Sequence, residues 1–432
     1  MLLSETSLST NQLSAIDRIS TRRSTILIAP TGAGKTVMCL TAIKRVIDAG
    51  KIKRVIVAAP AKVVENNVWG KEAAKWEHLD KSMVVSLGGT STERLHKLNH
   101  FNRGVIVVSL NNLDWLLNQG HGADGIIVDE LSKASGKQAK GLNTKSKGGM
   151  FKWRIGMTAT PVSQDYIKLF AMAKLVDGGK ALGTAKHNYL NKYFYSDYMG
   201  YKWTLKADGA ERIMEKINKL VHMVEDTKDA DLPAVHQHVI EFDMPASTRE
   251  HYDMMKKHMV TVDREAANEA VKSGVLRQIS SGFVYLENDD TLTYDWARYD
   301  AVRQWLKNLG RRRGVVFYEF KAQGQILNDL SRFTDDIQDF ISGDKDLLAA
   351  QINSLSHGVD GLQDVCSDML FYHPMWSNDA TQQAIGRLHR TGQEQEVNVT
   401  TLVCTDTLDS LVMERVEDRG EWMKLFKKHL KG

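Results

Sequence analysis

One short segment near the N-terminus constrains the fold of this chain more than any other. An apolar run, Thr25–Ile28, leads into Ala29-Pro-Thr-Gly-Ala-Gly-Lys-Thr36, and a helix-like run, Val37–Ile47, follows. The middle segment fits the phosphate-loop pattern G-x-x-x-x-G-K-S/T, with alanine at the first glycine position. Glycines in such a turn let successive backbone N–H groups face one anion, and the helix N-terminus adds partial positive charge. The segment therefore predicts a strand–loop–helix unit that binds a phosphate.

The phosphate loop also carries side chains suited to a nucleotide. Lys35 is placed to reach the β- and γ-phosphates, and the Thr36 hydroxyl is placed to hold Mg²⁺. The predicted cofactors are therefore ATP and Mg²⁺, bound by Thr31, Gly32, Ala33, Gly34, Lys35 and Thr36. The alternative is a glycine turn that binds nothing, and the strand and helix on either side of the loop argue against it.

Further apolar runs follow at helix-length intervals, at Val55–Ala59, Val105–Val108, Gly125–Val128 and Ile155–Met157. Continuous Ile/Val runs separated by helical segments indicate a parallel sheet that is covered on both faces. Such a sheet binds its ligand at the carboxyl ends of its strands. We therefore expect one edge of the sheet to collect the phosphate loop, Pro60, Ser109, Asp129 and Thr158.

Two acids end the segment Ile126-Ile-Val-Asp-Glu130. We expect Asp129 to hold Mg²⁺ through water and Glu130 to polarise the water that attacks the phosphate. A strand that ends in Asp-Glu is a weak signal alone, but it becomes a strong one after a phosphate loop. The next segment, Gly156-Met-Thr-Ala-Thr-Pro161, has small hydroxyl residues that can link the nucleotide site to a neighbouring surface through short hydrogen bonds.

The second half of the chain repeats the α/β pattern after a more helical stretch. Helix-like runs cover Glu211–Val224 and Ser247–Leu276, and strands are predicted at Gly314–Tyr318, Ile337–Phe340, Met369–Phe371 and Val397–Val403. We expect a first lobe that binds ATP at residues 1–182 and a second lobe at residues 297–432. Between them, residues 183–296 are expected to form a mainly helical connecting region with the start of the second lobe.

Two arginines stand out near the C-terminus, in Gln382-Gln-Ala-Ile-Gly-Arg-Leu-His-Arg-Thr-Gly-Gln393. Arg387 and Arg390 are spaced i, i+3, which on a helix places both guanidinium groups on one face. Guanidinium is planar and permanently charged, so it suits the charge of a transferring phosphoryl group. The alternative is a pair of arginines on a solvated helix face, which leaves Gln383, Gly386 and the final Thr-Gly-Gln unexplained.

Together these segments resemble a known family. The order of Gln12, Ala29–Thr36, Asp129–Glu130, Thr158–Thr160 and Gln383–Arg390 is similar to the superfamily 2 helicase-type ATPases. Finer matches resemble the Swi/Snf-like translocases, at Val55–Pro60 with Trp69 and Trp76, Arg154–Pro161, Leu175–Gly179, Asp231–Pro233 and Arg387–Gln393. The resemblance runs from about Ser9 to Leu411, and it is closest to the compact versions found in bacterial viruses and prokaryotes.

The resemblance implies an α/β fold of two RecA-like parallel-sheet lobes, with a helical insertion or connection between them and ATP in the cleft between the lobes. By the same resemblance, Gln12 should read the adenine. Arg387 and Arg390 should join Lys35 and Glu130 as catalytic residues. The segment His357–Gln363 matches the glycine-rich fifth motif of the family, which links nucleic acid to ATP, and this places Asp360 among the cofactor-binding residues.

The sequence departs from the family pattern at two places. Leu131-Ser132 follows the acids, where the common family box has Ala-His, and Val359-Asp360 stands where Gly-Leu is usual. The first departure concerns the side chain that couples the acids to the third motif of the family, here Thr158–Thr160. The second concerns the contacts with nucleic acid.

A basic stretch between Leu131 and Arg154 contains no acidic residue. Its cations are Lys133, Lys137, Lys140, Lys145, Lys147, Lys152 and Arg154. A basic loop beside the ATP site suits a phosphate backbone, because counterion release drives such binding without base specificity; a solvated loop is the alternative. Aromatic rings can stack on bases or pack between the lobes, and the candidates are Tyr189, Tyr193, Tyr195, Tyr198 and Tyr201.

The bulk properties exclude several classes of protein. The net charge is only +4, and the three cysteines show no metal-ligand spacing. We find no signal-peptide pattern and no apolar run long enough to span a membrane. The chain is therefore expected in the cytoplasm and without a membrane partner. The resemblance to compact phage and prokaryotic members implies a bacterial or phage-infected cell, and we expect a monomer.

The motifs predict an ATP hydrolase, and the Swi/Snf-like resemblance implies a motor on nucleic acid, specifically a translocase on double-stranded DNA. A strand-separating or branch-migrating helicase is one alternative, but it needs a wedge element, and we identify none in the sequence. An RNA-directed helicase is another. An ATP-gated nucleic-acid clamp without productive hydrolysis is the alternative from a different class, and the presence of Glu130, Arg387 and Arg390 argues against it.

Overall fold

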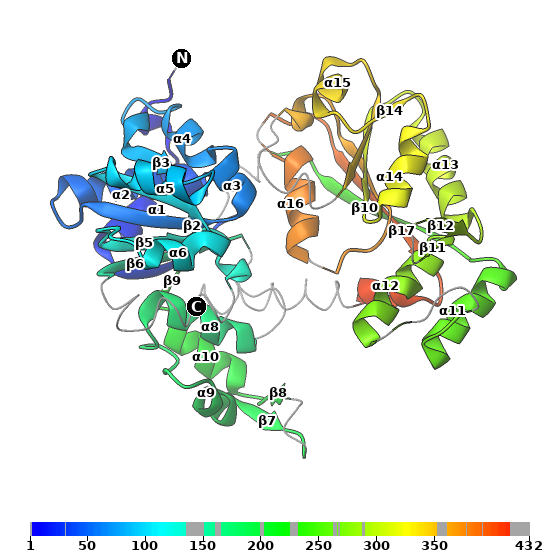
Figure 1. The fold of residues 1–432 in the computed structure, drawn as a ribbon, viewed down its shortest axis with the longest axis horizontal. Coiled ribbons are helices and arrows are strands. Elements are labelled where there is room, and N and C mark those ends of the chain that lie inside the picture. The colour runs from blue at the N-terminus through cyan, green and yellow to red at the C-terminus, as the bar shows by residue number, and fades with distance from the viewer. Residues whose placement is uncertain are drawn as a thin grey trace. The chain divides into compact units, whose positions relative to one another are not determined.

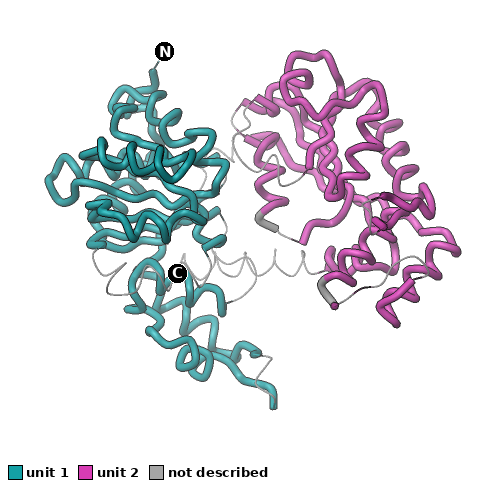
Figure 2. Tube along the Cα trace, viewed as in Figure 1, with its two compact units in different colours: residues 1–230, 422–432 teal, residues 231–421 magenta. Residues whose placement is uncertain are grey.

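The computed structural model describes residues 2–30, 32–134, 151–159, 166–198, 203–224, 232–261, 266, 268–286, 290–351, 361–376, 378–390 and 392–414. The chain divides into two compact units, which Figure 2 colours separately: unit 1 within residues 1–230 and unit 2 within residues 231–421. The segment 183–296, expected as a connecting region, is divided between the two units.

Unit 1 is built on a seven-stranded sheet in the order β3-β4-β2-β5-β6-β1-β9 (Figure 1). Its strands are β1 Ser24–Ile28, β2 Arg54–Ala59, β3 Val84–Ser86, β4 Gly104–Ser109, β5 Gly125–Val128, β6 Trp153–Thr158 and β9 Val221–Met223. Every neighbouring pair is parallel. The parallel sheet predicted for the first lobe is confirmed, with all of its predicted strands.

Alternate residues of these strands face opposite sides of the sheet and build two apolar cores. On β1, Leu27 faces a core with residues from α1 Thr10–Thr21, α2 Lys35–Asp48, α3 Ala61–Glu65 and α4 Val68–Ala73. Ile26 and Ile28 face the other core, with residues from α5 Ser91–Asn99, α6 Leu113–Leu117, α8 Tyr166–Asp177, α9 Lys186–Tyr193 and α10 Gly209–Ile217. Both faces are therefore covered, as a parallel sheet requires.

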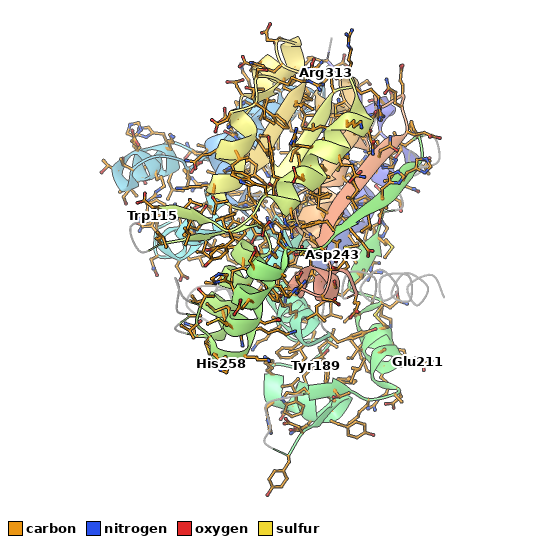
Figure 3. All side chains as sticks on the ribbon, turned by 90° about the vertical axis from the view of Figure 1, so that its right-hand side faces the viewer. Trp115, Tyr189, Glu211, Asp243, His258 and Arg313 are labelled. Carbon is orange, nitrogen blue, oxygen red and sulfur yellow. The ribbon has the colours of Figure 1, made fainter. Side chains whose placement is uncertain are left out.

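An aromatic cluster holds α8 and α9 together. The ring centroids of Phe170 and Tyr189 are 5.0 Å apart, those of Tyr189 and Tyr193 are 5.2 Å apart, and the Tyr189 hydroxyl donates to the Tyr166 carbonyl at 2.6 Å. Figure 3 shows Tyr189 within this group of elements. An antiparallel pair, β7 Phe194–Ser196 and β8 Trp203–Leu205, lies at the outer end of the group (Figure 1).

Unit 2 contains a six-stranded sheet in the order β10-β17-β16-β13-β15-β14, again with every neighbouring pair parallel. The strands are β10 Val235–Phe242, β13 Gly314–Tyr318, β14 Phe333–Thr334, β15 Leu347–Gln351, β16 Asp368–Phe371 and β17 Val397–Cys404. One face packs against α13 Ala297–Leu309 and α14 Lys321–Asn328, and the other against α15 Ile337–Ser342 and α16 Asn378–Leu388. The predicted fold of two α/β lobes with parallel sheets is thus confirmed.

A third apolar core of unit 2 involves helices that the sequence analysis predicted. It contains residues of α11 Ala246–His258 and α12 Glu269–Ile279, and of the antiparallel strands β11 Phe283–Tyr285 and β12 Thr291–Thr293. The segment Glu211–Val224 is helical only in part, because it ends in strand β9.

The strand predicted at Ile337–Phe340 is wrong, because this segment forms helix α15. The Asp336 carboxylate caps its N-terminus by accepting N–H bonds from Gln338 at 2.6 Å and Asp339 at 3.3 Å. Gly343, with φ of 93°, ends the helix. The strand of this region is β15, which begins a few residues later.

Unit 2 also contains a buried ionic cluster. Arg298 pairs with Asp409, and both side chains are at most 1% exposed. Nδ1 of His373 lies 3.5 Å from Oδ1 of Asp409, and the Gln323 amide contacts Nε2 of His373 at 2.8 Å. The pKa of His373 is lowered to about 3, mainly by burial and further by the nearby charge of Arg298. The imidazole is therefore neutral at physiological pH, and the cluster ties α13 and α14 to the chain beyond β16 and β17.

The cysteines are free thiols in buried positions, at Cys39, Cys366 and Cys404. Burial raises the pKa of each thiol, to about 12 for Cys366 and to about 11 for Cys404. The thiolate, which is the reactive form, is therefore scarce at all three positions near neutral pH.

Candidate active site

The predicted nucleotide-binding residues of unit 1 converge on one edge of its sheet. Strands β5, β6 and β1 are neighbours, and the register pairs Val128 with Gly156 and Ile28 with Thr158. The acids that follow β5, the hydroxyl that ends β6 and the loop that follows β1 therefore lie side by side. This convergence is what the sequence analysis expected of a parallel sheet.

Glycine geometry shapes the phosphate loop. Gly32 and Gly34 have φ of 89° and 82°, a left-handed conformation that residues with a side chain rarely adopt. A Cβ at position 34 would also lie 2.7 Å from Nε2 of Gln12. Gln12 donates from that atom to the Ala33 carbonyl at 3.0 Å. The left-handed backbone therefore favours glycine at position 34, and a side chain there would also displace the Gln12 amide.

Gln12 is itself held at the start of α1. Its side-chain oxygen accepts the Ser9 N–H at 2.9 Å, and the Ser9 hydroxyl accepts the Gln12 N–H at 3.2 Å. This reciprocal capping box fixes the glutamine beside the phosphate loop. Recognition of adenine by Gln12 stays a prediction.

Lys35 begins helix α2 and folds back over its own loop. Its ammonium donates to the carbonyls of Ala29 at 2.8 Å and Pro30 at 2.9 Å. Burial lowers the pKa of Lys35, and the carboxylates of Glu130 and Asp129 oppose that shift. Thr36 follows in the first turn of α2, so its hydroxyl belongs to the same helix start.

Asp129 is oriented by an indole. Trp69 of α4 is fully buried, and its Nε1 donates to Oδ2 of Asp129 at 3.2 Å. Burial and the neighbouring Glu130 raise the pKa of Asp129 to about 6, against the opposing effects of Trp69 and Lys35. A carboxyl with this elevated pKa, beside a phosphate loop, has the character expected of a functional site.

Glu130 has an unusual backbone conformation. Its φ of 63° and ψ of 64° are left-handed, which costs free energy for a residue other than glycine. One carboxylate oxygen, Oε1, accepts hydrogen bonds from the Ser132 hydroxyl at 2.9 Å and from the Thr158 hydroxyl at 3.2 Å. Because Thr158 is the last residue of β6, this hydrogen bond links Glu130 directly to the end of the neighbouring strand.

Leu131, which directly follows the two acids, packs against the neighbouring strand β6. It is fully buried, and a Cβ added to Gly156 of β6 would lie 2.5 Å from its Cδ2. The leucine therefore occupies the space above a glycine in the adjacent strand. Leu131 and Gly156 are a complementary pair, and the residue that departs from the family box has a partner in the sheet.

The arginines lie in unit 2, and their arrangement differs from the prediction. Helix α16 ends at Leu388, so Arg390 lies in the turn beyond it and the two arginines do not share one helical face. The helix ends here because the Gln393 amide donates to the Leu388 carbonyl at 3.2 Å and to the Cys366 carbonyl at 2.9 Å. His389 contacts the Pro233 carbonyl at 2.9 Å, which joins two of the segments that carry the family resemblance.

Several predicted residues lie outside the described residues. These are Thr31, Thr160, Pro161, Asp360, the rest of the fifth motif up to residue 360, Tyr201, and the basic-stretch residues Lys137, Lys140, Lys145 and Lys147. Of the described cations of that stretch, Lys152 lies 3.7 Å from Asp124, and Arg154 donates to the Leu175 carbonyl at 3.4 Å. Binding of nucleic acid by this stretch stays a prediction.

The tyrosines fall into two groups. Tyr189 and Tyr193 are 1% and 2% exposed and pack inside unit 1, whereas Tyr195 and Tyr198 are 64% and 102% exposed. The sequence alone did not separate them. Alternation along β7 separates Tyr195 from its neighbours, because residues next to each other on a strand face opposite sides.

Sequence reasoning missed the contacts of three residues at these sites. In the sequence, Trp69 indicates only the family resemblance, Ser132 only a departure from the family box, and Gln393 only part of a motif. No local pattern indicates their partners, because each contact joins segments whose proximity is set by the sheet.

The fold and this site define a class of protein, the phosphate-loop ATPases of the helicase type. A family model described as the SNF2-related domain matches residues 13–287, well over half of the chain. The chain therefore belongs to the SNF2-related family, and the resemblance seen in its motifs is confirmed.

Relatives from viruses, bacteria and animals are similar to the chain. "Putative protein p41" of Acyrthosiphon pisum secondary endosymbiont phage 1 is 28% identical over 422 residues, which cover 90% of each chain. The "Uncharacterized ATP-dependent helicase YqhH" of Bacillus subtilis is 23% identical over 457 residues, covering 91% of this chain and 74% of that protein. The "DNA excision repair protein ERCC-6-like" of Danio rerio is 30% identical over 179 residues, 38% of this chain and 12% of that protein. The near-complete match to the phage protein confirms the predicted resemblance to members found in bacterial viruses.

Among the described residues, no helix combines the length and the apolar character needed to cross a lipid bilayer.

Proposed function

We propose that the chain is a motor that uses ATP hydrolysis to move along double-stranded DNA. The observation that carries the proposal is the arrangement in unit 1, where the phosphate loop, Asp129 and Glu130 follow adjoining strands in a chain of the SNF2-related family. The names of the Bacillus and Danio relatives, a helicase and a DNA excision repair protein, support an ATP-dependent action on DNA.

The residues at the site fit ATP and Mg²⁺. A Cβ at Gly32 would meet nothing within 4 Å, so the loop is open where a phosphate approaches its backbone. The Thr36 hydroxyl and the Asp129 carboxylate are the hard oxygen donors that Mg²⁺ prefers. A cation next to Asp129 would offset the burial and the repulsion from Glu130 that raise its pKa.

Each residue has a distinct task in the proposed reaction. The N–H groups at the start of α2 hold phosphate oxygens, and the Lys35 ammonium exchanges its loop carbonyls for the β- and γ-phosphates. Mg²⁺, when bound, withdraws charge from the phosphate oxygens. The Glu130 carboxylate orients the attacking water and takes its proton. Arg387 and Arg390 stabilise the charge of the transferring phosphoryl group, and this role for unit 2 rests on the family resemblance.

The experiment that tests the proposal compares nucleic acids as activators. ATP hydrolysis should be stimulated more by duplex DNA than by single-stranded DNA, forked DNA or RNA of the same length. Displacement of a third strand from a triplex reports movement along the duplex without strand separation. RNA as the best activator would transfer the assignment to an RNA-directed helicase, and hydrolysis without triplex displacement would contradict translocation.

Strand separation is a second candidate function, and the β7–β8 pair favours it. Tyr195 faces outward opposite Thr204, and the Lys206 ammonium lies 5.3 Å from its ring centroid. On the other side, Phe194 and Leu205 pack toward the core of unit 1. An exposed ring beside a cation, on a supported ribbon, suits stacking on an unpaired base, as a wedge requires.

The wedge has its own test. Tyr195→Ala should abolish unwinding of a forked duplex but leave duplex-stimulated ATP hydrolysis intact, whereas Tyr195→Phe should keep both because it keeps the ring. Normal unwinding by Tyr195→Ala, or no unwinding by the unaltered protein, removes this candidate.

The remaining parts of the proposal concern the setting in which the motor works. The phage and bacterial relatives support action in the cytoplasm of a bacterial cell. We further propose that one copy of the chain is sufficient, and sedimentation of the protein with bound duplex DNA tests this.

A further inference from the structure

The turn that carries the two acids departs from the family pattern in its sequence. Where the common family box has Ala-His, this sequence has Leu131-Ser132. The Ser132 hydroxyl donates to Oε1 of Glu130 at 2.9 Å, and the Thr158 hydroxyl reaches the same oxygen at 3.2 Å. Two hydroxyls from different segments thus converge on the carboxylate that the proposed reaction uses to activate water.

The backbone shows why this carboxylate depends on such contacts. Glu130 is left-handed, and a short 3₁₀ turn, Leu131–Lys133, follows it, with the Lys133 N–H donating to the Glu130 carbonyl at 2.9 Å. The turn brings the Ser132 side chain back toward Glu130, two residues before it. Leu131 fixes the position of the turn, because it is fully buried against Gly156 of β6.

We propose that Ser132 is a positioning residue that holds the Glu130 carboxylate, jointly with Thr158, in the orientation needed to activate water. Thr158 holds the carboxylate to the end of β6, and Ser132 holds it to its own turn. In this chain the pair of hydroxyls links the acids to the third motif, so that a change at the end of β6 reaches Glu130 directly. This inference deepens the proposed function and rests on it.

The physical basis is the accuracy that catalysis requires. Hydrogen bonds to an ionised carboxylate are among the stronger ones, and two donors on one oxygen restrict its rotation. Catalytic groups act efficiently only when they are held within about 0.5 Å of the productive geometry. Loss of one donor leaves the charge and the fold in place but broadens the range of carboxylate orientations, so turnover should fall while nucleotide binding persists.

The chain offers a matched control for the Ser132 contact. Ser82 donates from its hydroxyl to Oδ2 of Asp80, also two residues before it, at 2.6 Å. This pair lies at the 3₁₀ turn Lys81–Met83 before β3, which is away from the strand ends that carry the acids. Ser82→Ala removes a serine–carboxylate bond of the same sequence spacing without touching the site.

The test measures kcat, KM for ATP, nucleotide affinity and thermal stability for Ser132→Ala, Ser132→Thr and Ser82→Ala. We expect Ser132→Ala to lower kcat about 10–100-fold, by analogy with the loss typical when a partner that orients a metal ligand is removed. Its KM, nucleotide affinity and melting temperature should stay close to those of the unaltered protein. Ser132→Thr should restore most of the kcat because it restores the hydroxyl, and Ser82→Ala should change nothing.

Other outcomes overturn the proposal. If Ser132→Ala has the kcat of the unaltered protein, Ser132 does not position the carboxylate. If its kcat falls together with its melting temperature, and Ser82→Ala shows the same loss, the role of Ser132 is merely structural. A crystal structure of Ser132→Ala provides a readout independent of activity, in which the Glu130 carboxylate should occupy more than one orientation although the Thr158 hydroxyl remains. An unchanged carboxylate there refutes the inference, whereas absent ATP hydrolysis in the unaltered protein refutes only the proposed function.

Discussion

Replacement of Gly156 by alanine tests whether Leu131 and Gly156 are a complementary pair. The new Cβ would lie 2.5 Å from Cδ2 of Leu131 and 2.9 Å from Cγ2 of Val176, well inside normal contact distance. Leu131 is fully buried, so it cannot move into solvent to relieve the contact. Overpacking of this kind costs about 1–3 kcal/mol. For a unit of this size, such a loss lowers the melting temperature by roughly 2–12 °C.

A second substitution, Leu131→Ala, tests whether the cost at position 156 arises from contact with this leucine. Leu131→Ala alone should destabilise unit 1 by about 2–5 kcal/mol, because it leaves a cavity. In the double variant the alanine methyl at position 156 enters the space that the leucine vacates. The double variant should therefore be more stable than the sum of the single effects predicts, by about 1–3 kcal/mol. The contact between position 156 and Val176 remains and limits the rescue.

Urea denaturation followed by circular dichroism gives the four free energies of unfolding in this cycle. Gly88→Ala is the control, because a Cβ at Gly88 would meet nothing within 4 Å. It should change the free energy of unfolding by less than about 1 kcal/mol. Additive effects of Gly156→Ala and Leu131→Ala would refute the pairing.

Three further predictions concern the reaction and the stability of unit 2. Lys35→Ala should abolish ATP hydrolysis and Glu130→Gln should leave ATP bound but uncleaved, measured by phosphate release and nucleotide binding; normal turnover by Glu130→Gln contradicts the assigned role. Arg390→Ala should lose most DNA-stimulated ATP hydrolysis, while its nucleotide affinity stays within several-fold of that of the unaltered protein. Arg390→Lys should restore little of the hydrolysis, because an ammonium lacks the planar fork of guanidinium. Unfolding of Arg390→Ala would indicate a structural arginine instead. The pKa of His373 is about 3 in the folded protein and ordinarily 6.5, so between these values the unfolded chain binds the extra proton and stability falls as the pH falls. Urea denaturation at pH 7 and pH 4.5 measures this loss of stability. The difference in the free energy of unfolding between the two pH values should be smaller in His373→Asn than in the unaltered protein, but unchanged in the control His258→Asn, whose histidine is exposed (Figure 3). An equal difference in His373→Asn and the unaltered protein would exclude His373 as the cause.

The sequence predicted the parts of the site that follow from sheet geometry. Parallel strands have their carboxyl ends at one edge, so the spacing of apolar runs was sufficient to bring the phosphate loop, Asp129 and Thr158 together. The contact between Ser132 and Glu130 was not predictable in this way. It depends on a left-handed backbone at a residue other than glycine, which no residue pattern indicates.

Two predictions were wrong, and the sequence holds part of the reason for each. The run Ile337–Phe340 is apolar enough for a strand, but Asp336 before it and Gly343 after it are the ordinary signals of a helix start and end. The i, i+3 spacing of the arginines predicted a shared face only if the helix continued. The helix ends at Leu388 because Gln393 folds back to its last carbonyls, and this is a contact formed by the tertiary structure.

The burial of all three native thiols makes the protein suited to site-specific labelling. Their raised pKa values leave them slow to react with maleimides at neutral pH, so a cysteine introduced at an exposed position will be modified selectively. Glu65 in unit 1 and Asn308 in unit 2 are exposed positions for a donor and an acceptor dye. Single-molecule energy transfer between them can follow the distance between the two units through each ATP cycle, without removal of any native residue from the cores.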